Sequence, residues 1–121
     1  RWDETTVAQA YALNDPALAV RTERSADASG AATTSLLSVD SPNIVIETVK
    51  RAEDGNGLIV RLYECRRTRG QATLTTSFDV AAAYRANIME ENQAELAAQG
   101  KTVEFSAKPY EIITLRLVPA N

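Results

Sequence analysis

Carboxylates are the side chains of this sequence whose types and spacing could do chemistry, and they gather in two places. Glu53 and Asp54 lie in the segment EDGNG (53–57), and Glu90 and Glu91 are neighbours in the chain. Hydrolysis of a glycosidic bond needs two carboxylates on opposite sides of that bond, about 5–10 Å apart. Adjacent residues do not flank a bond in this way, so we expect Glu90 and Glu91 to lie on a solvated surface.

The 53–57 segment has two interpretations, a cation site and a turn. A calcium-binding loop needs regularly spaced acids and a closing glutamate, and both are missing here. The Asp-Gly and Asn-Gly pairs are strong hairpin signals, because glycine adopts the positive φ of a tight turn without steric cost. The sequence therefore predicts, first of all, a hairpin turn.

Other catalytic groups are poorly supported. Histidine is absent from all 121 residues, which removes the commonest general base and metal ligand, although a Ser-Lys arrangement stays open. Cys65 is the single cysteine, and we expect it to be a small buried apolar side chain. A single cysteine cannot form an internal disulfide, so we also expect a reducing, cytoplasmic compartment. Arg66, Arg67 and Arg69 form too short a basic run for nucleic acid, and we expect a solvated turn.

Length and charge narrow the class of protein further. A chain of 121 residues with 45% apolar residues fits a single domain spanning 1–121. The formal net charge of −3 gives no electrostatic case for nucleic acid or an anionic membrane. The chain begins Arg-Trp-Asp rather than with methionine, so we expect a piece of something longer.

The elements that must position these residues are mostly short strands. Turn signals recur every 8–12 residues, and β-branched and aromatic residues are richest at 43–50 and 57–66. The expected strands are 6–13, 17–22, 35–39, 43–50, 57–66, 71–78, 101–106 and 109–119. Segment 23–32 is small and polar and favours a loop, 84–89 is ambiguous, and 90–99 has the composition of a short helix. We predict an all-β fold, an antiparallel β-sandwich of short strands with at most one short helical segment.

The hairpin formed by 43–50 and 57–66 places two opposite charges across from each other. A simple register puts Glu47 opposite Arg61, a pair that stabilises a sheet by roughly 0.2–1 kcal/mol. The same register places Val45 opposite Tyr63 and Val49 opposite Ile59. Glu64 falls near the strand end, where we expect a solvated carboxylate.

Four segments together resemble the C-terminal β-domain of glycoside hydrolase family 38 α-mannosidases. The first, SPNIVIETVKRAEDGNGLIVRLYE (41–64), joins a Lys-x-x-x-Asp-Gly-x-Gly loop to an Arg-Leu-Tyr-Glu strand. The other three follow in the order of the family and are QAYALNDP (9–16), FDVAAAYRANIMEE (78–91) and KPYEIITLRL (108–117). The resemblance covers nearly the whole chain and identifies 1–121 as a C-terminal fragment of a longer α-mannosidase.

The resemblance implies a non-catalytic accessory domain of a retaining, zinc-dependent exo-α-mannosidase. In that family the zinc ligands and the aspartate nucleophile belong to the N-terminal catalytic domain, so no catalytic residue, metal ligand or cofactor is expected in this fragment. The expected partners are the catalytic domain of the same protein and, through the intact enzyme, an α-mannoside glycan. Self-association of the full-length protein is open, and neither nucleic acid nor a membrane is expected.

The resemblance also names candidate site residues. A hairpin of the β-domain can lie near the sugar pocket in such enzymes, which makes Asp54, Gly55 and Asn56 candidates for substrate contact. Glu47, Arg61 and Tyr63 are either a structural pair with a neighbour or part of a face that the catalytic domain covers, since interface cores favour arginine and tyrosine.

A free-standing carbohydrate-binding or adhesion module is the alternative function. Such a module presents exposed aromatic side chains to a sugar. The chain has one Trp, four Tyr and two Phe, and most of them fall in strands that need core residues.

Overall fold

The computed structural model describes residues 3, 5–21 and 34–121. The chain divides into two compact units, Arg1–Thr33 and Thr34–Asn121. The prediction that 1–121 form a single domain is not decided by this division and stays a prediction.

The first unit contains the helix α1 (Thr6–Asn14), where a strand was expected over 6–13. That expectation is wrong. Alanines and a glutamine give the segment good helix propensity, and its apolar alternation is weak. Asp15 N–H donates to the carbonyl of Tyr11 and ends the helix, and Pro16 follows. Residues 17–21 contain no strand, whereas Thr22 and the expected loop at 23–32 lie outside the described residues.

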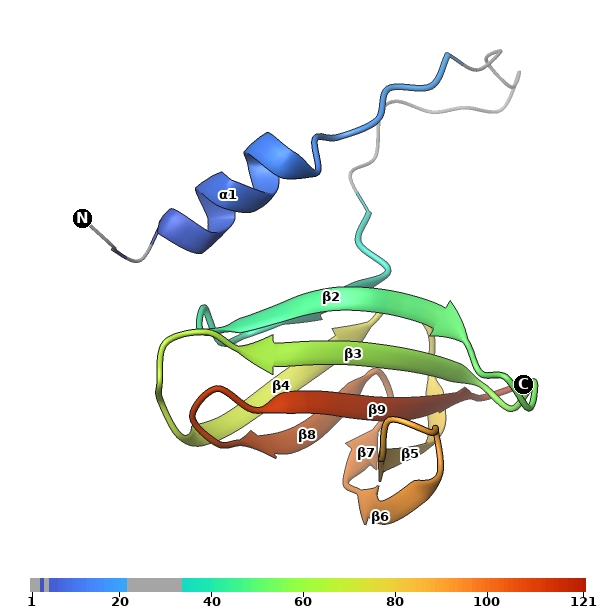
Figure 1. Ribbon diagram of the computed structural model, residues 1–121. Helices are drawn as coiled ribbons and strands as arrows, with labels where there is room; N and C mark the ends of the chain where they lie inside the picture. The colour runs from blue at the N-terminus through green and yellow to red at the C-terminus, as the bar shows by residue number, and fades with distance from the viewer. Residues whose placement is uncertain (1–2, 4, 22–33) are drawn as a thin grey trace. The chain divides into compact units, whose positions relative to one another are not determined.

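The second unit is a sandwich of two antiparallel sheets (Figure 1). The small sheet has the strand order β1 (Leu37–Val39), β4 (Gly70–Thr76), β8 (Thr102–Ala107) and β7 (Ala98–Gln99). The large sheet has the order β2 (Ile44–Arg51), β3 (Leu58–Glu64), β9 (Ile112–Pro119), β5 (Val80–Ala86) and β6 (Asn92–Leu96). The predicted fold class, an all-β antiparallel sandwich with at most one short helical segment, is confirmed for the described residues.

The core lies between the two sheets and follows the period of two that strands impose. Alternate residues of β3 and β9 point inward, where they pack against Leu74 and Phe105 of the small sheet. The buried residues of β3 and β9 in this core are Val60, Leu62, Ile113, Leu115 and Leu117. The outer face of β3 and β9 consequently carries the intervening residues, and it includes arginines from both strands.

Residues 92–96 and 98–99 form strands β6 and β7, and the short helix expected over 90–99 is wrong. β6 pairs along the edge of the large sheet, with Glu95 opposite Tyr84, and β7 pairs with β8. Backbone hydrogen bonds to a neighbouring strand override the helix propensity of this segment. Gly100 has φ +57° at the turn between β7 and β8. The ambiguous segment 84–89 begins as the end of β5.

The β2–β3 hairpin is antiparallel, as predicted, but its register shifts in the middle. Val45 is opposite Tyr63, whereas Thr48 rather than Glu47 is opposite Arg61, because a β-bulge lies between Ile46 and Thr48. The expected pairs Glu47–Arg61 and Val49–Ile59 are therefore wrong, and Val49 is opposite Val60. A one-residue shift moves every later side chain of β2 to the other face. The bulge thus places Lys50 on the outer face, opposite Ile59.

Candidate functional site

A groove of about 480 Å³ lies on the outer face of the large sheet. We call it the outer groove. Its floor comes from β3 and β9, and its walls come from the bulge of β2, the end of β5 and the residues that follow β5. The residues that line it are Glu47, Arg61, Arg85, Ala86, Asn87, Ile88, Gln93, Glu111, Ile112 and Thr114.

Arg61 lies in the outer groove together with Glu47, so the bulge keeps these two predicted residues near each other without pairing their backbones. Arg61 Nη2 donates to the carbonyl of Ile88 at 3.3 Å. Its Nε is buried and has no hydrogen-bond partner within the described part of the chain. At the far wall, Arg85 pairs with Glu111 at 2.7 Å. Arg116 Nε is likewise buried without a partner among the described residues, and of the two arginines only Arg61 lines the groove.

Apolar side chains border the outer groove and stay in contact with solvent. Ile88 and Ile112 are exposed by 73% and 76%, and Ile112 is opposite Tyr63 in the sheet. Tyr63 is half-buried and belongs to the same outer face as Arg61. Large exposed apolar side chains beside an arginine and a tyrosine are typical of a surface that another protein surface covers.

The 53–57 segment is a turn that joins β2 to β3, as the sequence predicted. Gly55 and Gly57 have φ +76° and +86°, in the left-handed region that glycine favours. A Cβ on Gly57 would lie 2.2 Å from the carbonyl oxygen of Leu117, so this position requires glycine. Asp54 Oδ1 accepts a hydrogen bond from the backbone N–H of Asn56 and tightens the turn.

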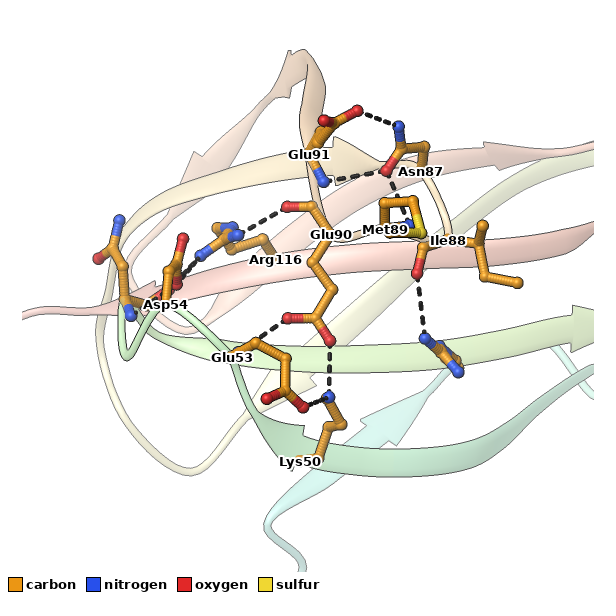
Figure 2. Close-up of polar contacts among 11 residues, drawn as sticks. Lys50, Glu53, Asp54, Asn87, Ile88, Met89, Glu90, Glu91 and Arg116 are labelled. Atoms are coloured by element: carbon orange, nitrogen blue, oxygen red, sulfur yellow. Dashed lines mark hydrogen bonds and ion pairs between the residues drawn. The ribbon is translucent and has the colours of Figure 1, made fainter.

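Arg116, on the outer face of β9, donates hydrogen bonds to this turn (Figure 2). Its buried guanidinium donates to Asp54 Oδ1 at 2.8 Å, to the Asn56 carbonyl at 2.7 Å and to the Glu90 carbonyl at 2.6 Å. Hydrogen bonds from Arg116 are the main reason that the pKa of Asp54 is lowered. The Asp54 side chain is still 57% exposed, so its outer oxygen faces solvent.

Glu90 connects a second loop to the turn, and its expected place on a solvated surface is wrong. The residue is buried and has φ +66°. Its carboxylate accepts a hydrogen bond from Glu53 N–H at 2.9 Å and pairs with Lys50 at 2.7 Å. The Glu53 N–H and then Lys50 lower the pKa of Glu90, and Glu53 and Glu90 in turn raise the pKa of Lys50. Glu91 is exposed, as predicted.

Glu64 is also buried, and its expected solvation at a strand end is wrong. Its carboxylate accepts hydrogen bonds from Asn43 Nδ2, Thr68 Oγ1 and the backbone N–H groups of Arg66 and Tyr110. Burial opposes ionisation, but these contacts prevail and lower the pKa of Glu64 to about 2. The carboxylate therefore joins three loop segments at one end of the sandwich.

The other residues singled out from the sequence are Cys65 and the arginines of 66–69. Cys65 is half-buried rather than buried, and Arg67, with φ +57°, lies in an exposed turn. Within the described ranges, no group of three or more His, Cys, Asp or Glu residues could hold a metal ion. No helix of the described part of the chain is long and apolar enough to cross a membrane.

The role of Arg116 and the burial of Glu64 and Glu90 were not predicted from the sequence. Arg116 had a usable signal, because it interrupts the apolar strand ITLRLVP just as Arg61 interrupts LIVRLYE. A charged residue on a strand that is buried on its inner face must either reach water or find partners on the outer face. The two carboxylates had no comparable signal, since Tyr110, which donates to Glu64, and Glu53, which donates to Glu90, lie 46 and 37 residues away in the sequence.

The sequence of this chain is similar to those of one family of known proteins. The family model described as the C-terminal β-sandwich domain of glycosyl hydrolases family 38 matches residues 43–115. The chain is 31% identical over 121 residues to human alpha-mannosidase 2C1, with 96% of this chain aligned. It is 32% identical over 114 residues to the mouse protein of the same name, with 90% aligned. The chain spans only 11% of the length of each of these relatives.

Proposed function

The chain belongs to the C-terminal β-sandwich domains of glycosyl hydrolases family 38, as its resemblance predicted, and we propose that it is a non-catalytic accessory domain of a retaining exo-α-mannosidase. In this proposal the domain packs against the N-terminal catalytic domain of the same protein. The catalytic domain acts on α-mannosides in glycans, and the accessory domain supports the rim of its sugar pocket.

The outer groove is the observation that carries this proposal. It combines a buried arginine nitrogen that no described residue satisfies with exposed apolar side chains on both sides. A buried donor without a partner costs about 1–3 kcal/mol, and a movement of the Arg61 side chain toward an acceptor of a docked domain would remove this cost. We propose that the face carrying Glu47, Arg61 and Tyr63 is covered by the catalytic domain, with Arg61 donating to an acceptor of that domain.

The chemistry of the described residues supports a non-catalytic role. The buried carboxylates Glu64 and Glu90 are held by hydrogen bonds within the fold, and Glu111 is engaged by Arg85 and by the Lys108 N–H. Zinc, which the family resemblance implies for the enzyme, does not fit the described part of this chain, because histidine is absent and its carboxylates do not cluster around a common point. We therefore assign zinc to the catalytic domain and expect the chain alone to hydrolyse no aryl α-mannoside. We also propose a cytoplasmic location, which the single cysteine supports.

The 53–57 turn supports a contribution to the pocket rim. Arg116 and the Asn56 N–H use only one oxygen of Asp54, which leaves the other oxygen and the Asn56 side chain for hydroxyl groups of a sugar. Hydrogen bonds that involve a charged group contribute about 1.5–3 kcal/mol. Replacing Asp54 by alanine in the full-length enzyme should therefore lower kcat/KM for an aryl α-mannoside roughly ten- to a hundred-fold.

Two further variants separate substrate contact from the integrity of the turn. Asp54→Asn keeps an acceptor for Arg116 and the Asn56 N–H but places an amide where the outer oxygen was, so it should retain the turn and still lose activity. Asp79→Ala removes an exposed acid from the turn between β4 and β5 and should leave kcat/KM unchanged. Full activity of both Asp54 variants would leave the segment as a turn without a role in the pocket.

A further inference from the structure

The 87–91 loop, which connects β5 to β6, is tightly ordered by its own hydrogen bonds. Asn87 Oδ1 accepts from the N–H groups of Met89 and Glu91 at 2.9 and 3.0 Å. The Asn87 carbonyl accepts from Glu90 N–H, and Asn87 N–H donates to the Glu91 carbonyl, both at 3.0 Å. The left-handed backbone of Glu90 closes the loop. These bonds fix the loop in one conformation.

Two arginines of the large sheet donate hydrogen bonds to this loop, and Figure 2 shows the contact of Arg116 with Glu90. Arg116 donates to the carbonyl of Glu90 at 2.6 Å, and Arg61 donates to the carbonyl of Ile88 at 3.3 Å. Because Arg116 also holds Asp54, the 87–91 loop and the 53–57 turn are fixed relative to each other. The Glu90 carboxylate adds a second connection through Glu53 N–H.

The side chains at the end of this ordered loop are apolar and face solvent. Ile88 is 73% exposed and Met89 is 75% exposed, so neither contributes much to the core of the sandwich. Ordering two adjacent apolar side chains in water adds no stability to the fold. It does favour binding, because a segment already fixed in its bound conformation loses less conformational entropy on association.

We propose that Ile88 and Met89 are an apolar anchor that inserts into an apolar pocket of the catalytic domain, and that Arg116 and Glu90 are positioning residues for it. The inference rests on the proposed function. Relatives aligned along almost the whole chain are about nine times as long, since the chain spans 11% of them, so such an enzyme has extensive protein surface to supply the pocket. Ile88 also lines the outer groove, which makes the anchor continuous with the proposed interface.

The flanking groups define the chemistry of that pocket. Glu53 and Asp54 beside the loop are 82% and 57% exposed, and both are carboxylates. The pocket that receives Ile88 and Met89 should therefore have hydrogen-bond donors or basic side chains at its rim. Docking of the anchor would fix the position of Asp54 through Arg116.

Met89 is the only methionine of this chain, so its oxidation can be followed through one peptide of the full-length enzyme. The folded enzyme is treated with dilute hydrogen peroxide, and sulfoxide formation in the peptide containing Met89 is followed by mass spectrometry against N-acetyl-methionine amide in the same solution. Exposed methionine oxidises readily, whereas buried methionine is protected. We expect Met89 to react at least ten-fold more slowly than the standard. A rate within two-fold of the standard would overturn the anchor.

Variants test the positioning roles in the same protein. Ile88→Ser with Met89→Ser should make the connection between the domains at least ten-fold more sensitive to limited proteolysis. Leu36→Ser, at a 53% exposed leucine of the small-sheet side, should not. Arg116→Gln should speed amide hydrogen exchange at Met89 and Glu91 at least ten-fold, and Arg116→Lys should restore part of the protection. Unchanged proteolysis or unchanged exchange would contradict the respective role.

The outcomes distinguish this inference from the function on which it rests. Protected Met89 in an enzyme that fails to cleave α-mannosides would support the anchor and refute the proposed activity. An active α-mannosidase whose Met89 oxidises at the rate of the standard would refute the anchor alone.

Discussion

Replacing Glu64 by glutamine should destabilise the sandwich strongly, although the two side chains have the same shape. One glutamate oxygen accepts from Asn43, Thr68 and the Arg66 N–H, and the other accepts from the Tyr110 N–H. A glutamine that keeps its oxygen toward the first three donors turns its NH₂ toward the Tyr110 N–H.

The magnitude follows from these contacts. The lost hydrogen bond to a charged group is worth about 1.5–3 kcal/mol, and the buried N–H left without an acceptor adds about 1–3 kcal/mol. The three remaining bonds also weaken because the charge is gone. We expect the free energy of unfolding to fall by about 3–5 kcal/mol, which is a large part of the stability of a small domain.

Urea unfolding followed by circular dichroism at pH 7 measures this difference. Glu104→Gln, at an exposed glutamate of β8, is the matched control and should change the free energy of unfolding by less than about 0.5 kcal/mol. A loss below about 1 kcal/mol for Glu64→Gln would show that the carboxylate is not the acceptor we describe.

The pH dependence gives an independent check. The pKa of Glu64 is lowered from its ordinary value of 4.5 to about 2 in the folded protein, because the hydrogen bonds to the carboxylate outweigh its burial. The unfolded chain therefore takes up the proton first, and the stabilisation is complete above about pH 5 and is lost as the pH falls toward 2. The stability gap between the natural protein and Glu64→Gln should shrink across that range. A gap that stays constant from pH 7 to pH 2 would refute the linkage.

Two further predictions concern the turn and the core, both measured by urea unfolding. Gly57→Ala should cost more than 2 kcal/mol, since φ is +86° and the new Cβ would meet the backbone of Leu117, whereas Gly55→Ala, with φ +76° in open space, should cost only about 1 kcal/mol; equal losses would refute the close approach. Phe105→Ala should cost about 3–5 kcal/mol because the ring is buried between the sheets, and a loss under 2 kcal/mol would mean that the core refills the space.

Local signals were reliable where the physical cause is itself local. The glycines at 55 and 57 predicted the turn because positive φ is a property of a single residue, and the β-branched and aromatic residues of 57–66 predicted β3 because such side chains suit an extended backbone. Together with the quoted segments, these signals were enough for the sandwich and for the family.

Local sequence signals predicted the wrong secondary structure for two segments, 6–13 and 90–99. Segment 6–13 became a helix because its alanines and glutamine favour one, and segment 90–99 became strands because pairing with β5 and β8 overrides its helix propensity. The register of β2 failed for a related reason. The bulge between Ile46 and Thr48 brings Lys50 to the outer face, where it pairs with Glu53 and Glu90, and neither of these partners is a strand neighbour.

The sequence by itself determined that this chain forms a β-sandwich of a known family, with a glycine turn at 53–57 and an arginine in each of two apolar strands. Only the tertiary structure decided which charges are buried. Arg116 and Glu90 meet across 26 residues, and Glu64 and Tyr110 across 46, so no local pattern records them. A buried charge is tolerated only when several donors or acceptors converge on it, and this convergence is a property of the packed loops.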